Sequence, residues 1–564
     1  MRRPARLAAA GALLISLALL TGCATIPLSG PVQEGSSSDT DDALELDLIA
    51  RGPAAGATQA EILLGFIDAA ATPQDRYAVA RQYLTSSFDD VWNPDAGTTI
   101  DRGVDREYTS TGELAMSLSV TPTAVVGQHG DYTEDLPDAR VALSYEFQKV
   151  KGEWRISKAP QGTLIDETTF PQVFNSYPLY FYDTSYTHMV PDLRWFPRRV
   201  STPTQIVREL LAGPSEWLAG AVVSAFPEGA TLTADTVTVL SRDAQVPLNS
   251  DALRADQATL QRMKLQLVES LSGVPTIGSV TISTNQIEQD IPDLARYQVP
   301  RVDSRALIMR DGVFGYLPAS DDTLVPIDGL SDAIESLSPT AVTLGAGQTT
   351  AAVLSDVGVS SVRSGRDPVA LDDRDDLIAP SIDTAGYVWS VPADDPGAIR
   401  AYGLDGSVNE VATSWPDSSR IVALRLSREG TRLIAELESE GRSRFVAAAI
   451  IRGDGERRQV PVKLGAWIPL PSADGVPLDA SWVDDLTVAS LTRLPDGSTT
   501  VVTQQIGGPS QSIDGSPDAV GISGGNTVRD LRLLLSTGFL EQRQGIGWQP
   551  RIDGVQMLAT QQGL

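Results

Sequence analysis

The chain has 564 residues and is strongly acidic, with 72 Asp and Glu against 44 Lys and Arg and a formal net charge of −28. This charge argues against binding to nucleic acid and against lying flat on anionic lipid. The length allows three or more domains of about 100 to 200 residues. The sequence holds one cysteine and two histidines. If that cysteine is modified, no thiol is left for a disulfide, a zinc cluster or a nucleophile.

The N-terminus has the features of a bacterial lipoprotein signal. A positively charged start, Arg2 to Arg6, precedes the apolar run Leu7 to Leu20, which is too short to span a bilayer. The run ends in Leu20-Thr21-Gly22-Cys23, which resembles a lipobox. This resemblance implies cleavage between Gly22 and Cys23, and an S-diacylglycerol and an N-acyl chain on Cys23. The alternative is an ordinary secretory signal with an incidental cysteine.

The lipid would set where the protein resides. Two acyl chains anchor a protein stably, whereas a single chain binds only marginally. We therefore expect a lipid-anchored protein on the extracytoplasmic face of the cell membrane, without a transmembrane helix. Residues 1–22 are the predicted signal peptide. Residues 23–55, rich in Pro, Gly, Ser and Asp, are the predicted lipidated cysteine and flexible tether.

Residues 56–170 are predicted to form a small α+β domain. Thr58 and Glu61 make a capping box before one amphipathic helix, and Thr72-Pro73 predicts the start of a second. Alternating apolar residues from Val141 to Phe147 then predict a strand that returns after a Lys151-Gly152 turn. Helices followed by an antiparallel sheet favour a curved-sheet fold of the nuclear-transport-factor-two-like kind. Such a fold would not by itself fix a function.

Residues 171–295 are predicted to form a second α+β domain. A strand over 177–182 precedes a helix with Thr202 as N-cap, Pro203 in its first turn and Gln205 as the capping-box partner. That helix is expected to stop at Gly213-Pro214. A second helix is expected to start near Ser250, and a strand near Val280 closes the unit.

Three motifs of this unit relate it to a known module. They are Leu179-Tyr180-Phe181 before Val190-Pro191, the stretch Val207 to Pro214, and Ala225 to Gly229. With these motifs the unit resembles the GerMN domain of spore-germination and cell-envelope lipoproteins. In that family the motifs are packing and turn signatures, so the resemblance implies no catalytic residues.

Residues 300–564 are predicted to form a β-propeller-like domain. Short strands separated by Gly, Asp, Pro and Ser turns contain three weak copies of one unit, at 380–389, 424–433 and 480–488. The spacings of 44 and 56 residues between Ile382, Leu426 and Trp482 are close to a four-stranded blade plus a loop. The region has room for about six blades. The competing architecture is a long β-sandwich.

The order of lipobox, tether, α+β domain, GerMN domain and propeller resembles the LpqB family of actinobacterial lipoproteins over essentially the whole chain. The family implies a non-enzymatic accessory role. Its members are associated with the extracytoplasmic part of the sensor histidine kinase of the Mtr two-component system. They are also associated with envelope homeostasis and cell division. We expect no cofactor and no metal.

Candidate catalytic residues are sparse. His129 and His188 lie in different predicted domains, and neither is flanked by a nucleophile-elbow pattern. The run Asp372 to Asp376 lacks the alternating oxygen ligands and glycine of a calcium loop, so a solvated loop is favoured. The aromatic cluster Tyr177 to Tyr186, with Trp195 and Phe196, is the most interaction-like stretch, although core packing explains most of it.

Two functions therefore compete, beside a third, a structural spacer or assembly chaperone of the envelope, which the sequence barely separates from the first. The first is a non-enzymatic binding lipoprotein whose propeller and GerMN surfaces dock a membrane sensor kinase. The alternative is a cell-wall carbohydrate-binding or hydrolytic lipoprotein that uses the central channel of the propeller. The alternative requires two carboxylates facing each other across that channel, beside exposed aromatic residues.

Overall fold

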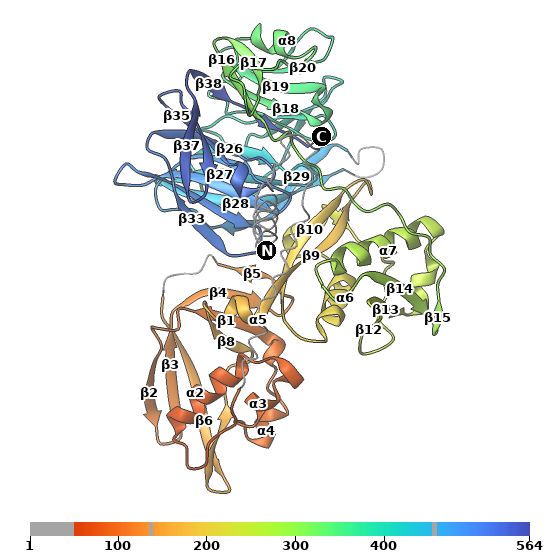
Figure 1. Ribbon diagram of the computed structural model, residues 1–564, viewed down its shortest axis with the longest axis vertical. Coiled ribbons are helices and arrows are strands. Elements are labelled where there is room, and N and C mark those ends of the chain that lie inside the picture. Colours follow the sequence, from red (N-terminus) through yellow and green to blue (C-terminus); the bar gives the residue numbers. More distant parts are fainter. Residues whose placement is uncertain (1–49, 135–138, 454–458, 564) are drawn as a thin grey trace, which may run out of the picture. The chain divides into compact units, whose positions relative to one another are not determined.

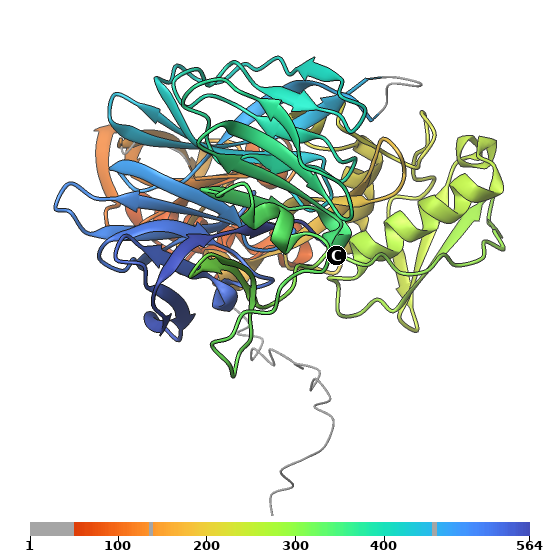
Figure 2. The ribbon, with the colours of Figure 1, turned by 90° about the horizontal axis from the view of Figure 1, so that it is seen from above.

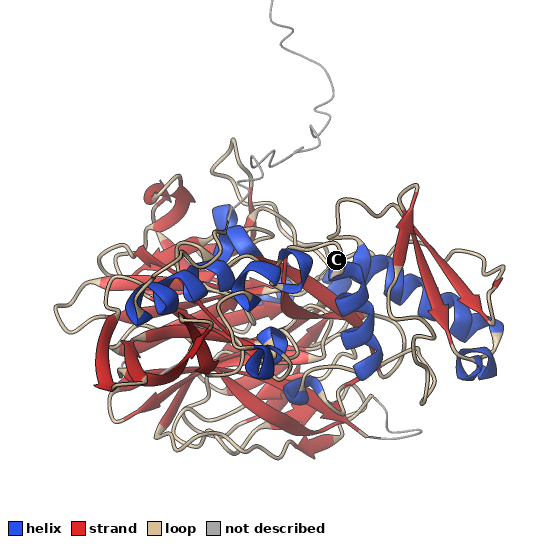
Figure 3. Ribbon diagram, turned by 90° about the horizontal axis from the view of Figure 1, so that it is seen from below, coloured by secondary structure: helices blue, strands red, loops and turns tan. Residues whose placement is uncertain are grey.

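A computed structural model describes residues 50–134, 139–453 and 459–563. Strands predominate in these residues, and most of the helices belong to the first two domains (Figure 3). Gly22, Cys23 and the tether up to residue 49 lie outside the described residues, so the lipid anchor remains a prediction.

The first domain places its helices against a strand-rich core. Thr58 and Glu61 form the predicted capping box of helix α2, and a buried cluster joins α2 to the face of one sheet through Leu63, Phe66 and Phe147. The two sheets have the orders β2-β3-β6-β7 and β5-β4-β1-β8 (Figure 1). The bounds are α2 Gln59–Ala70, α3 Ala78–Arg81, α4 Ser86–Asp89, β1 Gly97–Asp101, β2 Glu107–Gly112, β3 Ala115–Val120, β4 Pro122–Gly127, β5 Tyr132–Thr133, β6 Val141–Val150, β7 Glu153–Lys158 and β8 Thr163–Asp166.

The second domain combines two small sheets with two helices around one buried cluster. Sheet β10-β9-β11 contains a long antiparallel hairpin, and sheet β12-β13-β14-β15 pairs β13 with β14 in parallel. Leu210 of α6 and Leu267 of α7 are fully buried in the shared core. The bounds are α5 Phe170–Val173, β9 Phe174–Asp183, β10 Met189–Pro197, α6 Thr202–Ala212, β11 Val222–Val223, β12 Thr238–Leu240, β13 Asp243–Leu248, α7 Gln257–Leu271, β14 Ser279–Thr284 and β15 Ile287–Glu288.

The helix starts differ from the sequence prediction in the first domain. Asp75, Arg76 and Tyr77 all have positive φ, which a continuous right-handed helix cannot accommodate. The helix predicted after Thr72-Pro73 is therefore replaced by a 3₁₀ turn, Gln74–Arg76, and the short helix α3.

The second domain shows two similar differences. Ser201, not Thr202, is the N-cap of α6, and the Gln205 side chain accepts a hydrogen bond from Arg199 Nε at 3.3 Å instead of completing a capping box. The helix expected near Ser250 is a separate 3₁₀ turn, and α7 begins after Asp256, whose carboxylate accepts from the Thr259 N–H at 2.8 Å.

The third domain is a β-propeller of six sheets among the described residues (Figure 2). One strand of each sheet, at or next to its edge, contacts that of the next in turn, from β18 through β22, β26, β30 and β34 to β38, and β38 contacts β18 again. Strand β38, the last but one in the chain, pairs with β16 and completes the first blade, and β39 then pairs with β18 of the second. A closed ring of this kind excludes the alternative β-sandwich.

The strands of the six blades follow in chain order. The bounds are β16 Ala306–Arg310, β17 Val313–Leu317, α8 Ser331–Glu335, β18 Ala341–Leu344, β19 Thr350–Ser355, β20 Gly358–Arg363, β21 Val369–Asp372, β22 Ser381–Ile382, β23 Val388–Ser390, β24 Arg400–Tyr402, β25 Val408–Glu410, β26 Arg420–Leu426, β27 Arg432–Ser439, β28 Arg442–Arg452, β29 Pro461–Leu470, β30 Val476–Trp482, β31 Thr487–Arg493, β32 Thr499–Gln505, β33 Ser510–Asp514, β34 Ala519–Ser523, β35 Arg532–Leu535, β36 Leu540–Gln544, β37 Gly547–Ile552, β38 Val555–Leu558 and β39 Thr560–Gln561.

Candidate functional site

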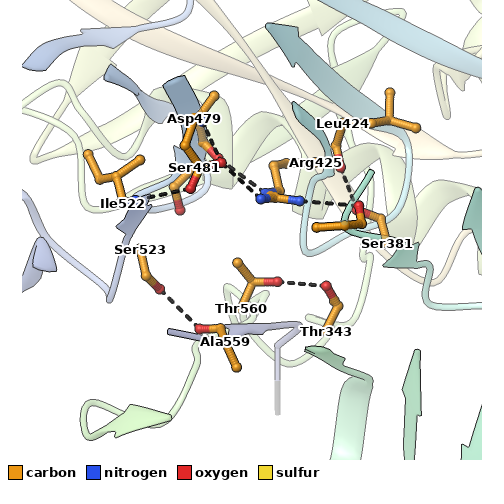
Figure 4. Close-up of polar contacts among 12 residues, drawn as sticks. Thr343, Ser381, Leu424, Arg425, Asp479, Ser481, Ile522, Ser523, Ala559 and Thr560 are labelled. Atoms are coloured by element: carbon orange, nitrogen blue, oxygen red, sulfur yellow. Dashed lines mark hydrogen bonds and ion pairs between the residues drawn. The ribbon is translucent and has the colours of Figure 1, made fainter. Parts of the chain in front are cut away.

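The innermost strands of the propeller are linked all the way round by polar contacts (Figure 4). Four blades contribute a Ser or Thr at this position, and the fourth blade contributes Arg425. Thr560 of β39, which pairs with β18 of the second blade, closes the ring. The links are Thr343 Oγ1 to the Pro380 carbonyl (2.6 Å), Ser381 Oγ to the Leu424 carbonyl (2.6 Å), Arg425 Nη2 to Asp479 Oδ1 (2.9 Å), Gly524 N–H to Ser481 Oγ (2.9 Å), Ser523 Oγ to the Ala559 carbonyl (3.4 Å) and Thr560 Oγ1 with Thr343 Oγ1 (2.7 Å).

These side chains surround a small cavity at the centre of the ring. The cavity that they line has a volume of about 30 Å³, enough for one or two water molecules. Ligand sites for small molecules commonly have about 300–1,000 Å³. Arg425 lies in the lining, and the described residues of the lining include no pair of facing carboxylates. The channel therefore does not fit the carbohydrate site that the alternative function requires.

Arg425, Arg428 and Arg432 of the fourth blade are buried. Arg432 is fully buried, and its Nε donates to Glu429 Oε1 at 2.7 Å. Its guanidinium also lies over the Trp482 ring, 5.1 Å from the ring centroid. Since burying an unpaired charge is costly, these partners identify Arg432 as part of the framework of the propeller.

Strand β10 of the GerMN-like domain touches both other domains. Arg194, which is 2% exposed, pairs with Asp192 at 2.9 Å and with Asp131 of the first domain at 3.1 Å. On the propeller side, Arg432 Nη1 donates to the Pro191 carbonyl at 3.4 Å. The residues from Val190 to Pro197 therefore have the structural role that the sequence indicated, and they also form domain junctions, which it did not indicate.

A second junction joins the first domain directly to the propeller. The Ser510 N–H and hydroxyl donate to the two carboxylate oxygens of Glu134 at 2.8 and 3.0 Å. Burial raises the pKa of Glu134, although the hydrogen bonds from Ser510 oppose that shift. Nothing in the local sequence around Glu134 indicates this partner, which lies 376 residues away.

Most of the predicted aromatic cluster is core. Tyr177, Phe181, Tyr182 and Phe196 are each at most 5% exposed. Tyr186 is the exception, with 38% of its surface exposed. It lies at the turn between β9 and β10.

His129 and His188 lie in different places and do not form a common site. His129 Nδ1 is 2.8 Å from Glu209 Oε2 of α6, so His129 belongs to the junction between the first two domains. This contact was not predicted. His188 ends the turn after β9 and lines two cavities beside it.

The first and last residues of the acidic run Asp372 to Asp376 form ion pairs with arginines. Arg374 pairs with Asp372 at 2.7 Å, and Arg420 pairs with Asp376 at 3.3 Å. Burial opposes ionisation of Asp372, but hydrogen bonds from Arg374 and Ser390 outweigh it and lower its pKa to about 2. Within the described ranges, no group of three or more His, Cys, Asp or Glu side chains is placed to hold a metal ion.

Fold and junctions together define a multidomain protein with an α+β domain, a GerMN domain and a six-bladed propeller. Family models match in the same order. They are the N-terminal domain of lipoprotein LpqB over residues 52–171, the sporulation and spore germination domain over 178–290, and the β-propeller domain of lipoprotein LpqB over 316–558. The chain belongs to the LpqB lipoprotein family.

Relatives named lipoprotein LpqB occur in several actinobacteria. The Streptomyces avermitilis protein is 27% identical over 590 residues, which cover 94% of each chain. The Cutibacterium acnes protein is 29% identical over 303 residues, which cover 53% of this chain and 50% of the relative. The match thus spans about half the length of that second relative. The family name indicates a membrane-anchored location in the envelope.

Two solved structures are similar to parts of the chain. The first GerMN domain of the sporulation protein GerM from Bacillus subtilis has 19% identity and a TM-score of 0.18, covering 22% of this chain and 93% of that one. A putative TolB from Agrobacterium tumefaciens has 11% identity and a TM-score of 0.30, covering 40% and 85%. Among the described residues, no helix is both long enough and apolar enough to cross a bilayer.

Proposed function

We propose that this protein is a non-enzymatic lipoprotein, anchored through Cys23 on the extracytoplasmic face of the cell membrane, that binds a membrane sensor histidine kinase as an accessory or regulatory partner. The kinase is the sensor of the Mtr two-component system, and the outcome is an effect on envelope homeostasis and cell division. The family resemblance supplies the partner.

The small central cavity of the propeller is the observation that best supports a binding role. Propellers that act on small substrates need space at the axis, and here the ring of hydroxyls and Arg425 leaves about 30 Å³. The remaining candidate surfaces are the outer faces and the grooves between elements. Protein partners dock on such surfaces.

Charge is consistent with this role. A chain with a net charge of −28 would be repelled by anionic lipid headgroups unless the acyl chains held it there. Anchoring through lipid and binding through the folded domains are therefore separate tasks. A substitution can abolish the anchoring without changing the folded domains, and the reverse.

The test is co-purification from detergent-solubilised membranes with the native chain and with Cys23→Ser. The native chain is expected to recover the sensor kinase. Cys23→Ser, which leaves residues 50–564 unchanged, is expected to fold normally but to lose both the membrane and the kinase in cells. Recovery of no membrane protein by the native chain, or full activity of the soluble variant, would contradict the proposal.

A further inference from the structure

The turn between β9 and β10 separates two open cavities of about 430 and 440 Å³. Thr187 and His188 line both of them. The larger cavity is bounded by this turn, by α7 and by residues 294–300, which lead from the second domain to the propeller. We call it the hairpin groove. Its volume is within the range of about 300–1,000 Å³ that ligand sites commonly have.

The wall formed by the turn is held in place by its own hydrogen bonds. Asp183 Oδ1 accepts from the N–H groups of Thr187 at 2.7 Å and His188 at 2.9 Å. The hydroxyl of Ser185 donates to the other oxygen of the same carboxylate. A surface already fixed in this way loses little conformational entropy when it binds a partner.

Tyr186 occupies this turn at a conformational cost. Its φ is +59°, a backbone region that bulky residues rarely adopt because it is strained for them. Glycine or asparagine would fit the turn more easily. With 38% of its surface exposed, Tyr186 is also not a core residue. One part of its ring packs against buried Tyr182, with the ring centroids 5.4 Å apart, and its exposed part lines the groove.

Arg262 of α7 stacks on that tyrosine. Its guanidinium carbon lies 4.4 Å from the centroid of the Tyr186 ring. In the part of the chain that the structure describes, the guanidinium has no carboxylate within ion-pair distance, although acidic residues outnumber basic ones by 72 to 44. A stacked guanidinium keeps its N–H edge available, and that edge matches a carboxylate with two parallel hydrogen bonds.

The opposite wall offers main-chain groups. Residues 294–299 form no helix or strand, and among the described contacts the only backbone N–H of this segment with a protein acceptor is that of Tyr297, 3.4 Å from Glu269 Oε1. Leu294 is 39% exposed at the same wall. Exposed main-chain groups beside apolar side chains are the features by which an extended peptide is bound.

We propose that the hairpin groove binds an extended, acidic peptide segment of the membrane partner, with one carboxylate of the segment on Arg262 and apolar side chains against Leu294 and Leu265. The choice of a peptide rests on the proposed function, which supplies a protein partner. The choice of an acidic one rests on Arg262 and on Arg296, which is 54% exposed beyond its contact with Glu269. Sugar stacking is disfavoured because Arg262 covers a face of the Tyr186 ring.

The test places a photo-crosslinking amino acid at Leu294 in the full lipidated chain in living cells. The matched control places it at Leu240, which is 60% exposed in the same domain and outside the groove. We expect a strong crosslink at Leu294 alone, and mass spectrometry is expected to identify an acidic segment of a membrane protein. Arg262→Glu should reduce this crosslink by about tenfold or more. Arg254→Glu, at an exposed arginine outside the groove, should leave it unchanged.

Several results would overturn the assignment. They are a crosslink no stronger than at Leu240, one that persists in Arg262→Glu, or one to a glycan, a lipid, a basic segment, residues 24–49 of the same chain or a second copy. Thermal unfolding of each variant shows whether it is folded. If the native chain still recovers the kinase while Leu294 makes no crosslink, the groove assignment is wrong and the proposed function stands. If the native chain recovers no kinase either, both the groove assignment and the proposed function are wrong.

Discussion

Trp195 Nε1 donates a hydrogen bond to the carbonyl oxygen of Gly507 at 2.8 Å, joining strand β10 of the GerMN domain to the propeller across 312 residues of sequence. The same indole packs against Phe170 and Tyr132, with ring centroids 5.0 and 5.7 Å away. Trp195 thus contacts elements on both sides of β10. Side chains of this strand connect domains that each have their own core.

Trp195→Phe is expected to weaken the coupling between the GerMN domain and the propeller. The ring packing is largely kept, but the Gly507 carbonyl loses its donor, at a cost of about 1 kcal/mol. Calorimetry should show the unfolding of the two domains moving apart in temperature. Trp548→Phe is the control, because Trp548 Nε1 makes a 2.8 Å bond to the Asp514 carbonyl within the propeller. A variant that unfolds like the native chain would contradict the coupling.

Arg425→Met should destabilise the propeller more than the removal of any single hydroxyl group of the inner ring. Removing Arg425 leaves Asp479, whose side chain is only 16% exposed, without its cation. Removing one partner of a buried pair typically costs about 3–5 kcal/mol, whereas Ser381→Ala should cost about 1 kcal/mol. Denaturant unfolding measures both.

The matched control for this prediction is Arg442→Met. Arg442 lies 3.6 Å from Asp474, and both side chains are more than 70% exposed. Exposed pairs of this kind contribute little. Equal losses in Arg425→Met and Arg442→Met would show that the inner ring does not stabilise the propeller.

The three weak repeats in the sequence correspond to real blades. Ser381, Arg425 and Ser481 occupy equivalent places in strands β22, β26 and β30, and each contributes to the inner ring. The repeats were visible because these strands are followed by a turn and a second apolar strand. The first, second and sixth blades lack that local signature, so their existence followed only from the length of the region.

Other features had no local signal. The contact of His129 with Glu209 joins two domains, and neither residue lies in a motif that points to the other. The helix predicted after Thr72-Pro73 had good start signals, but positive φ angles at residues 75–77 interrupt it because the tertiary packing of Tyr77, 3% exposed, outweighs local propensity. Of the hairpin groove, the sequence indicated only the aromatic residues, since Arg262 reaches Tyr186 from another element.

Glu436 makes the stability of the propeller depend on pH. It is fully buried, and burial raises its pKa to about 8, although a hydrogen bond from Ser443 opposes this. In the unfolded chain the group titrates near 4.5, so between about pH 4.5 and 8 the folded state holds a proton that the unfolded state has released. Stability should therefore fall as the pH rises through this window, by about 3 kcal/mol between pH 4.5 and 7.

Glu436→Gln removes this titration while keeping an acceptor for Ser443. Its contribution to the free energy of unfolding should no longer change between pH 5 and 8. Glu438→Gln, two residues further along β27, is the control and should keep the native slope. The measurement is urea unfolding at several pH values, and an unchanged slope in Glu436→Gln would exclude Glu436 as the source.

Deleting residues 554–564 should open the propeller. These residues include β38, whose Met557 pairs with Met309 of β16 and is 4% exposed, and β39, which pairs with β18. Without them β16 becomes an unpaired edge beside an exposed core, a state prone to aggregation. Limited proteolysis should then degrade residues 306–552 while the first two domains resist. Thr560→Val separates the two effects, because it removes a single hydroxyl from the inner ring and keeps both strands. It should cost about 1 kcal/mol and leave the propeller protease-resistant.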